Sequence, residues 1–173
     1  MNEYYSLDKS RTLLREIWGR RRAQVSSNHI NDSRFAVLDQ IVAPETRALE
    51  VGTGPGTFLE ALHRRYKLDI GRVHGVDLDH GSVEVAQERG LSVRHANVEQ
   101  DEIGTSKYDL VMAFELIEHL IDPLQFLAKA RRALVDSGYL FMSTPNSHGL
   151  DNIAMGYNFE GRYLAHPSIR RCT

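Results

Sequence analysis

The sequence has little cysteine, no long apolar run and no strong excess of either charge. Its 173 residues include one cysteine, Cys172. A lone cysteine cannot form an intrachain disulfide, which favours a reducing, cytoplasmic compartment. No apolar segment approaches the roughly 20 residues that a membrane-spanning helix needs, and the polar start of the chain does not resemble a secretory signal. The formal net charge of −2 gives no electrostatic case for a nucleic-acid partner.

Length and composition fit one globular domain. The chain is 42% apolar and 25% charged, which is typical of a folded domain large enough to bury a core. It has no internal repeat and no low-complexity segment. We therefore expect a single domain over residues 1–173.

The first forty residues are predicted to form two helices. One helical face carries Leu13, Leu14, Ile17 and Trp18, and another carries Phe35, Leu38, Ile41 and Val42. Asp32 or Ser33 is placed to cap the second helix. Between the two helices, residues 19–22 form a short basic cluster, which we interpret as a solvated helix end rather than a phosphate site.

From residue 47 on, patterns typical of strands and helices alternate. Strands are predicted over 48–51, 73–76, 91–94, 108–114 and 139–142. The helices between them are marked by Phe58, Leu62 and Tyr66, by a cap at Asp79 with an end at Gly90, and by Leu120, Leu124, Leu127, Ala130 and Leu134. This alternation predicts an α/β fold with a parallel sheet. After residue 145 periodicity is weak, and we expect mostly loop.

The segment 49–59 is the most informative part of the chain. An apolar run containing Glu50 leads into three glycines at alternate positions, and a helical pattern begins at once. Glycines allow a tight turn and a close approach of backbone to ligand at the end of a strand. The spacing differs from the dinucleotide pattern G-x-G-x-x-G, because Thr57 stands at the last position. A carboxylate at Glu50 disfavours a pyrophosphate and suits a ligand with an ammonium and a sulfonium, which points to S-adenosylmethionine rather than NAD.

Residues 47–146 resemble the core of class I S-adenosylmethionine-dependent methyltransferases, most closely the ubiquinone-biosynthesis O-methyltransferase type. Four segments carry the resemblance, in the family's order and spacing: 49–56, 75–79, 108–123 and 138–146. The set is specific for the family and not for its substrate. It implies a Rossmann-like sheet, usually of seven strands in the order 3-2-1-4-5-7-6. Five parallel strands are seen in this sequence, and the usual strands 6 and 7 are absent.

The resemblance also divides the single methyltransferase domain into parts. N-terminal helices would occupy 1–43, the cofactor-binding core 44–146, and an incomplete C-terminal part 147–173. The missing strands indicate either a truncated chain or a short protein completed by a partner or a second copy, and we favour truncation. We expect such a chain to bind its cofactor, to catalyse poorly alone and to self-associate or need a partner, since an open strand edge recruits other chains.

The resemblance implies a cofactor site at the carboxyl ends of the strands. The glycine turn would pass under the methionine and ribose groups, Glu50 would organise the methionine end, and Asp77 would accept from the ribose hydroxyls. Asn97 stands where the family commonly has an aspartate for the adenine amino group, and a plain surface asparagine is the open alternative. The predicted cofactor-binding residues are Glu50, Gly52, Thr53, Gly54, Gly56, Asp77, Leu78, Asn97, Val98, Phe114 and Glu115.

The run from Glu115 to His119 has two open interpretations. On a helix, Glu115, Glu118 and His119 share one face and offer two carboxylates and an imidazole to a divalent metal such as magnesium. The run resembles the metal motif of quinone O-methyltransferases and of small-RNA ribose 2′-O-methyltransferases, with His148 or His166 as a further ligand. Alternatively, it shapes the loop as in metal-free members, and His119 is the catalytic base.

The implied function is methyl transfer from S-adenosylmethionine to an oxygen of a small molecule. One alternative is a metal-dependent RNA 2′-O-methyltransferase, against which the near-neutral charge argues. Another is a non-catalytic subunit that binds S-adenosylmethionine and needs a partner. The expected partners are therefore a small-molecule acceptor and a second copy or completing chain, without a membrane span or nucleic acid.

Overall fold

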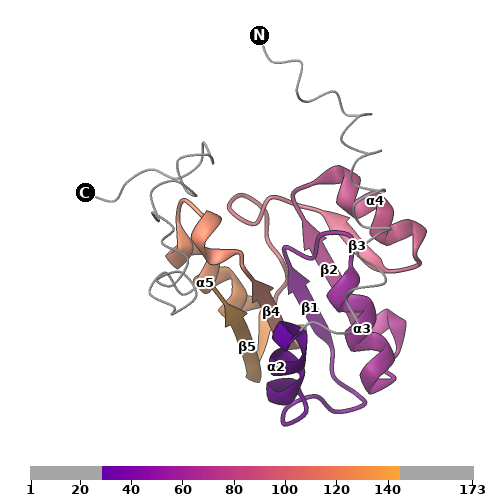
Figure 1. Ribbon diagram of the computed structural model, residues 1–173. Coiled ribbons are helices and arrows are strands. Elements are labelled where there is room, and N and C mark those ends of the chain that lie inside the picture. Colours follow the sequence, from indigo (N-terminus) through magenta and orange to yellow (C-terminus); the bar gives the residue numbers. More distant parts are fainter. Residues whose placement is uncertain (1–28, 145–173) are drawn as a thin grey trace, which may run out of the picture.

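The computed structural model describes residues 29–144 (Figure 1). Several predictions from the sequence lie outside these residues: the first helix, the basic cluster at 19–22, and the residues His148, His166 and Cys172. Within the described range, no helix is both long enough and apolar enough to cross a membrane.

Five parallel strands form one sheet in the order β3-β2-β1-β4-β5. They are β1 (Ala48–Val51), β2 (Val73–Asp77), β3 (Ser92–His95), β4 (Tyr108–Phe114) and β5 (Leu134–Ser143). Strand β1 pairs with β2 on one side and with β4 on the other. The winding direction therefore reverses between β1 and β4, and a crevice at such a point is where open α/β sheets bind ligands. The predicted fold class and strand order are confirmed.

Helices cover both faces of the sheet (Figure 1). One face carries α2 (His29–Leu38), α3 (Thr57–Tyr66) and α4 (His80–Glu88), and the other carries α5 (Pro123–Ala133). Side chains along a strand alternate between the faces. Thus β4 sends Leu110 and Met112 into the core under α2–α4, and Val111 and Ala113 into the core under α5. A strand buried on both faces has the nearly continuous apolar sequence seen here.

The ends of α4 agree with the sequence-based expectation. The Asp79 carboxylate accepts from the backbone N–H of Ser82 at 2.8 Å, which caps the helix. Gly90, just after the helix, has a φ of +79°, as glycine at a helix end commonly does. A short 3₁₀ helix, η3 (Ile70–Arg72), leads into β2.

Two helices differ from the prediction. Within the described residues, helix α2 covers His29–Leu38, so Asp32 and Ser33 lie inside it and do not cap it. Helix α5 begins at Pro123 after an N-cap at Asp122, since proline suits the first helical position.

The buried side of α5 is formed by Phe126, Lys129, Ala130 and Ala133. The predicted leucine stripe is wrong at three positions. Leu120 precedes the helix, Leu134 begins β5, and Leu124 is 75% exposed.

Strand β5 begins earlier than predicted and contains an irregularity. Leu134 lies opposite Tyr108, whereas Tyr139 lies opposite Leu110, so residues 135–138 bulge out of register. Gly138 ends this bulge where space is tight. A Cβ atom there would lie 2.9 Å from Leu134 Cδ2 and 3.1 Å from the carbonyl oxygen of Tyr108.

Replacing Gly138 with alanine should lower the free energy of unfolding by about 1–3 kcal/mol, because the added methyl group meets backbone that cannot easily move. The neighbouring exposed Ser137→Ala is the control, with an expected change within about 0.5 kcal/mol. Urea unfolding followed by circular dichroism measures both variants. An unchanged midpoint for G138A would contradict the packing at the bulge.

Candidate functional site

The glycine turn lies at the carboxyl end of β1, beside the point where the winding reverses. Gly52, Gly54 and Gly56 all have positive φ angles, of 74°, 53° and 75°, so other residues would strain the turn. A Cβ atom on Gly54 would meet nothing within 4 Å. The backbone of the turn is therefore open to a ligand at this position. The N–H groups of Gly52 and Thr53 both donate to the carbonyl of Val76, which holds the turn over the end of β2.

Asp77, at the end of β2, supports the turn directly. Its Oδ2 accepts from the N–H of Gly54 at 2.6 Å, and its Oδ1 accepts from the N–H of Asp79 at 2.8 Å. Each carboxylate oxygen has two lone pairs, so each keeps one for a further donor. Asp77 can therefore hold the turn and still accept from two ligand hydroxyls. The sequence suggested the second role and not the first.

Glu50 lies under the glycine turn, with its side chain only 4% exposed. The hydroxyl of Thr53 donates to Glu50 Oε2 at 2.7 Å. Burial raises the pKa of Glu50 to about 8, against the smaller opposing effects of the Thr53 hydrogen bond and the Arg34 charge. Near neutral pH this acid is therefore mostly protonated, which differs from the carboxylate expected from the sequence. A cation arriving nearby would favour its ionisation.

Gly75 makes room for this arrangement. It lies opposite Glu50 in the β1–β2 register. A Cβ atom on Gly75 would lie 2.7 Å from Thr53 Cγ2 and 2.9 Å from Val93 Cγ2. Glycine here lets Thr53 sit where it can donate to Glu50. From the sequence alone, Gly75 was recognised only as the first residue of the family segment 75–79.

Arg34 lies at the site, although no feature of the sequence pointed to it. It comes from α2 and reaches the ends of β4 and β5, where its guanidinium lies 4.1 Å from the ring centroid of Phe114. One terminal nitrogen donates to Ser143 Oγ at 3.1 Å and lies 3.6 Å from Glu115 Oε1. Burial lowers the pKa of Arg34, and the charges of Glu115 and Glu50 oppose that shift. Nothing local distinguishes this arginine from other surface arginines, because its partners are far away in sequence.

The turn after β3 forms the next wall of the site. The N–H of Ala96 donates to the carbonyl of Asp77 at 2.9 Å, which places the turn beside that acid. Asn97 Oδ1 accepts from the N–H of Glu99 at 3.0 Å, and Val98 packs into the core under α5. Leu78 is 63% exposed next to Asp77. These residues lie together, and their contact with adenine stays a prediction.

The predicted helix face with Glu115, Glu118 and His119 is wrong. The short 3₁₀ helix η4 (Ile117–His119) excludes Glu115, which has a φ of +53°. The N–H of Glu115 donates to the carbonyl of Ser143, so the strand pairing continues to this residue and the chain then turns sharply.

The two carboxylates of this segment have separate partners. Glu115 Oε1 accepts from Ser143 Oγ at 2.8 Å, and Glu118 Oε2 accepts from Thr144 Oγ1 at 3.1 Å. Residues 29–144 contain no group of three or more histidine, cysteine, aspartate or glutamate side chains that could hold a metal. His119 is exposed at the carboxyl end of the sheet, and its role as a base stays a prediction.

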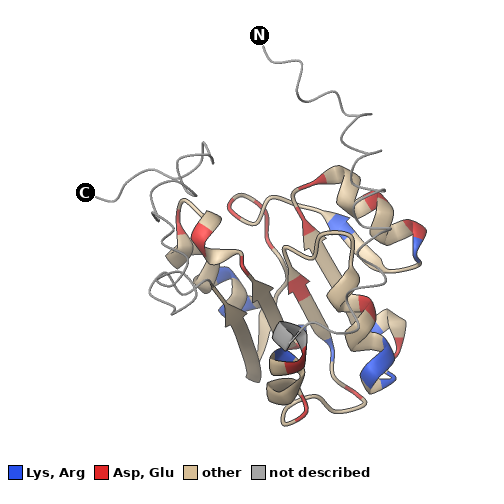
Figure 2. Ribbon diagram, viewed as in Figure 1, with Lys and Arg blue, Asp and Glu red and all other residues tan. Residues whose placement is uncertain are grey.

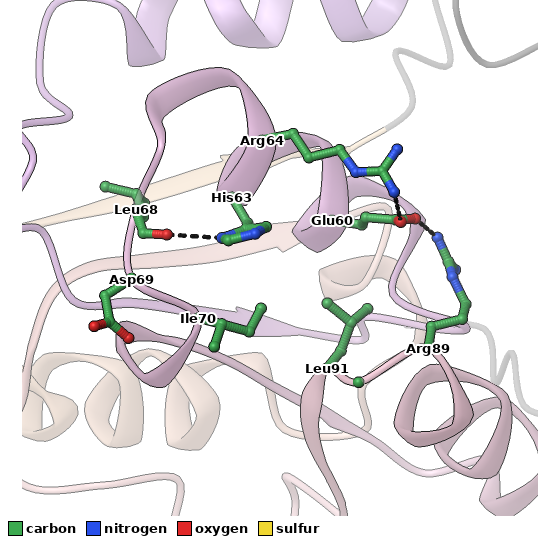
Figure 3. Close-up of a pocket in the computed structure, with 9 residues that line it drawn as sticks. Glu60, His63, Arg64, Leu68, Asp69, Ile70, Arg89 and Leu91 are labelled. Carbon is green, nitrogen blue, oxygen red and sulfur yellow. Dashed lines mark hydrogen bonds and ion pairs between the residues drawn. The ribbon is translucent and has the colours of Figure 1, made fainter.

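A separate pocket of about 540 Å³ lies beside α3 (Figure 3), and none of the predicted cofactor-binding residues lines it. Its lining comes from α3, from residues 68–70 and from residues 89–91, of which the last two segments precede β2 and β3. It therefore lies toward the amino ends of these strands. Arg89 forms an ion pair with Glu60 of α3 and donates to the carbonyl of Pro55 in the glycine turn. These contacts connect the segment before β3 to both α3 and the glycine turn.

Comparison with known sequences identifies the chain's relatives. Residues 9–171 match a family described as a methyltransferase domain. The ubiquinone biosynthesis O-methyltransferase of Leptothrix cholodnii is 30% identical over 129 residues, which cover 69% of this chain and 53% of the relative. The chain thus spans about half the length of the curated relative.

Solved structures show the same fold. A TehB-like S-adenosylmethionine-dependent methyltransferase from Corynebacterium glutamicum superposes with a TM-score of 0.66 at 20% identity, over 91% of this chain and 80% of the other. Phosphoethanolamine N-methyltransferase 2 of Haemonchus contortus, solved with S-adenosyl-L-methionine, gives a TM-score of 0.59 at 20% identity, over 77% of this chain and 35% of the other.

The buried acid predicts a measurable pH dependence of stability. The pKa of Glu50 is higher in the folded protein than in the unfolded chain. At pH values between these two pKa values, the folded protein therefore holds a proton that the unfolded chain has lost. The free energy of unfolding falls as the pH rises through this range. Relative to Glu50→Gln, the wild type should lose about 2 kcal/mol between about pH 5.5 and pH 7.5. Denaturant unfolding at several pH values measures the difference.

The exposed Glu45→Gln is the matched control, and its stability should follow that of the wild type with pH. Parallel pH profiles for the wild type and E50Q would show that Glu50 is already ionised in the folded protein, and would contradict its burial as a neutral acid.

Proposed function

The chain belongs to the methyltransferase domain family, and we propose that it binds S-adenosylmethionine at the glycine turn and methylates an oxygen of a small molecule. The observation that carries the proposal is the arrangement of Asp77. This acid holds the open glycine turn and keeps one lone pair on each oxygen for a further donor.

The charges and polar groups of the site suit each part of S-adenosylmethionine. Asp77 would accept from the two ribose hydroxyls, with the Asn97–Val98 turn and the exposed Leu78 beside the adenine. The methionine end carries a carboxylate, which would be attracted to Arg34. It also carries an ammonium group, and with the sulfonium this would favour ionisation of Glu50.

S-adenosylmethionine brings an already activated methyl group, so the protein must mainly align the acceptor and exclude water. Phe114 and Leu116 supply apolar surface at the end of β4. We assign removal of the acceptor's hydroxyl proton to His119, which lies in the turn after β4 and has a side chain type suited to general base catalysis near neutral pH.

An oxygen acceptor is favoured by the relatives, since the L. cholodnii protein is named for O-methylation in ubiquinone biosynthesis. An RNA acceptor gains no support from charge. Figure 2 shows acidic residues at the ends of β1 and β2, and basic residues spread among acidic ones over the helices. Binding of RNA phosphates needs clustered cations instead.

Magnesium binding stays a prediction, and it has weaker support than the assignment of His119 as the base. Glu115 and Glu118 accept hydrogen bonds from two different hydroxyls in β5 and just after it. A shared ion would require both carboxylates to leave these partners. The proposed cytoplasmic setting and the need for a second copy or a completing partner also stay predictions.

The first test is ligand binding. Isothermal titration calorimetry should show binding of S-adenosylmethionine and S-adenosylhomocysteine and none of NAD at comparable concentration. Asp77→Ala should weaken binding by about 1–3 kcal/mol, because two hydroxyl donors lose their acceptor. Asp69→Ala is a matched control: Asp69 also accepts from a backbone N–H, of Gly71, but lies at the amino end of β2. Binding of NAD as strong as that of S-adenosylmethionine would refute the proposal.

The second test separates a base from a metal. With a simple catechol as acceptor, methyl transfer by the protein should persist in excess EDTA, and His119→Asn should lower kcat by roughly 10²–10⁴-fold. Radiolabelled S-adenosylmethionine gives the rate. Loss of activity in EDTA with recovery in magnesium would instead establish the metal mechanism and remove His119 as the sole base.

A further inference from the structure

Lys129 is a charged side chain buried in the core. It belongs to the sheet-facing side of α5, with Phe126 and Ala130, and is only 4% exposed. Lysine is almost never fully buried without partners, because removing an ammonium from water is costly. Its presence at a core position therefore calls for specific acceptors.

Those acceptors are backbone carbonyls of the turn after β3. Lys129 Nζ donates to the carbonyl of Val98 at 2.9 Å and to that of Asp101 at 3.0 Å. The turn is closed by its own bonds, since Asp101 Oδ2 accepts from the N–H of Asn97 at 2.8 Å. The ammonium group of Lys129 thus attaches the first and last residues of the segment 98–101 to α5.

A second contact fixes the same turn from its exposed side. Glu99 Oε1 accepts from the N–H of Ile121 at 2.6 Å and from that of Asp122 at 3.3 Å. Both donors lie at the start of α5, where Asp122 is the N-cap. Lys129 and Glu99 together attach the turn to two places on one helix. We call residues 97–101 with these two contacts the clamped turn.

We propose that Lys129 is a positioning residue, which through the clamped turn holds Asn97 and Val98 in place to recognise the adenine of S-adenosylmethionine. This inference rests on the proposed function. The turn begins beside Asp77, because the N–H of Ala96 donates to the Asp77 carbonyl. If the clamped turn moved, Asn97 and Val98 would therefore no longer be correctly placed for the adenine while Asp77 held the ribose.

The test compares two ligands that differ only in the base. S-adenosylhomocysteine carries adenine with an exocyclic amino group, whereas S-inosylhomocysteine has a carbonyl at that position. The wild type should prefer the adenine ligand. Lys129→Met should weaken S-adenosylhomocysteine binding roughly tenfold, because two carbonyls lose their donor, and should reduce the preference for adenine by about threefold or more.

Two further variants make the comparison specific. Lys129→Arg can still donate to both carbonyls and should retain most of the preference. Lys107→Met, which removes an exposed lysine just before β4, should bind both ligands as the wild type does. A purely structural role for Lys129 would change stability and leave the ratio of the two affinities unchanged in the folded fraction.

The outcomes are separable. A folded K129M protein with the wild-type preference, or a wild type without any preference, would overturn the role of the clamped turn while leaving cofactor binding intact. Failure of the wild type to bind S-adenosylhomocysteine would overturn the proposed function itself. If K129M does not fold, Glu99→Ala takes its place: a reduced preference supports the proposal and an unchanged one refutes it.

Discussion

The candidate site depends first on the hydrogen bond between the Asp77 carboxylate and the N–H of Gly54. Parallel strands bring their carboxyl ends to one edge of the sheet, but this alone does not fix the loops that follow them. The bond joins the loop after β1 to the end of β2, and the second Asp77 oxygen holds the start of the α4 cap. Charge-assisted bonds of this kind are stronger than neutral ones. One side chain therefore sets the relative position of two loops at the point where the sheet reverses its winding.

Beneath the turn, packing determines charge. Gly75 leaves space for Thr53, Thr53 donates to Glu50, and the resulting enclosure raises the pKa of Glu50 to about 8. An acid poised in this way can be neutral when the site holds water and ionised when a cation lies above it. The site can thus match the charge of a ligand without keeping a bare carboxylate buried in its absence.

The sequence predicted the strands well, because a buried parallel strand is an apolar run with a polar residue at its end, and both features are local. It also placed the glycine turn and Asp77 at the ends of their strands, where the structure has them, and their contacts with a cofactor stay predictions. It failed where distant contacts decide the structure. The face of α5 was misjudged because Lys129 is buried through carbonyls far away in sequence, while Leu124 is exposed. The left-handed backbone at Glu115 and the reach of Arg34 toward β5 have no local signal either.

The contacts that shape the site share a chemical feature: most join a side chain to backbone atoms. Asp77 accepts from two N–H groups, Glu99 from two more, and Lys129 donates to two carbonyls. Backbone groups are the same whatever residues surround them, so a few charged side chains can hold the loops while the remaining lining changes. Under the proposed function, the residues that hold the loops would maintain the geometry of the cofactor site, and the residues between them would be free to determine the methyl acceptor.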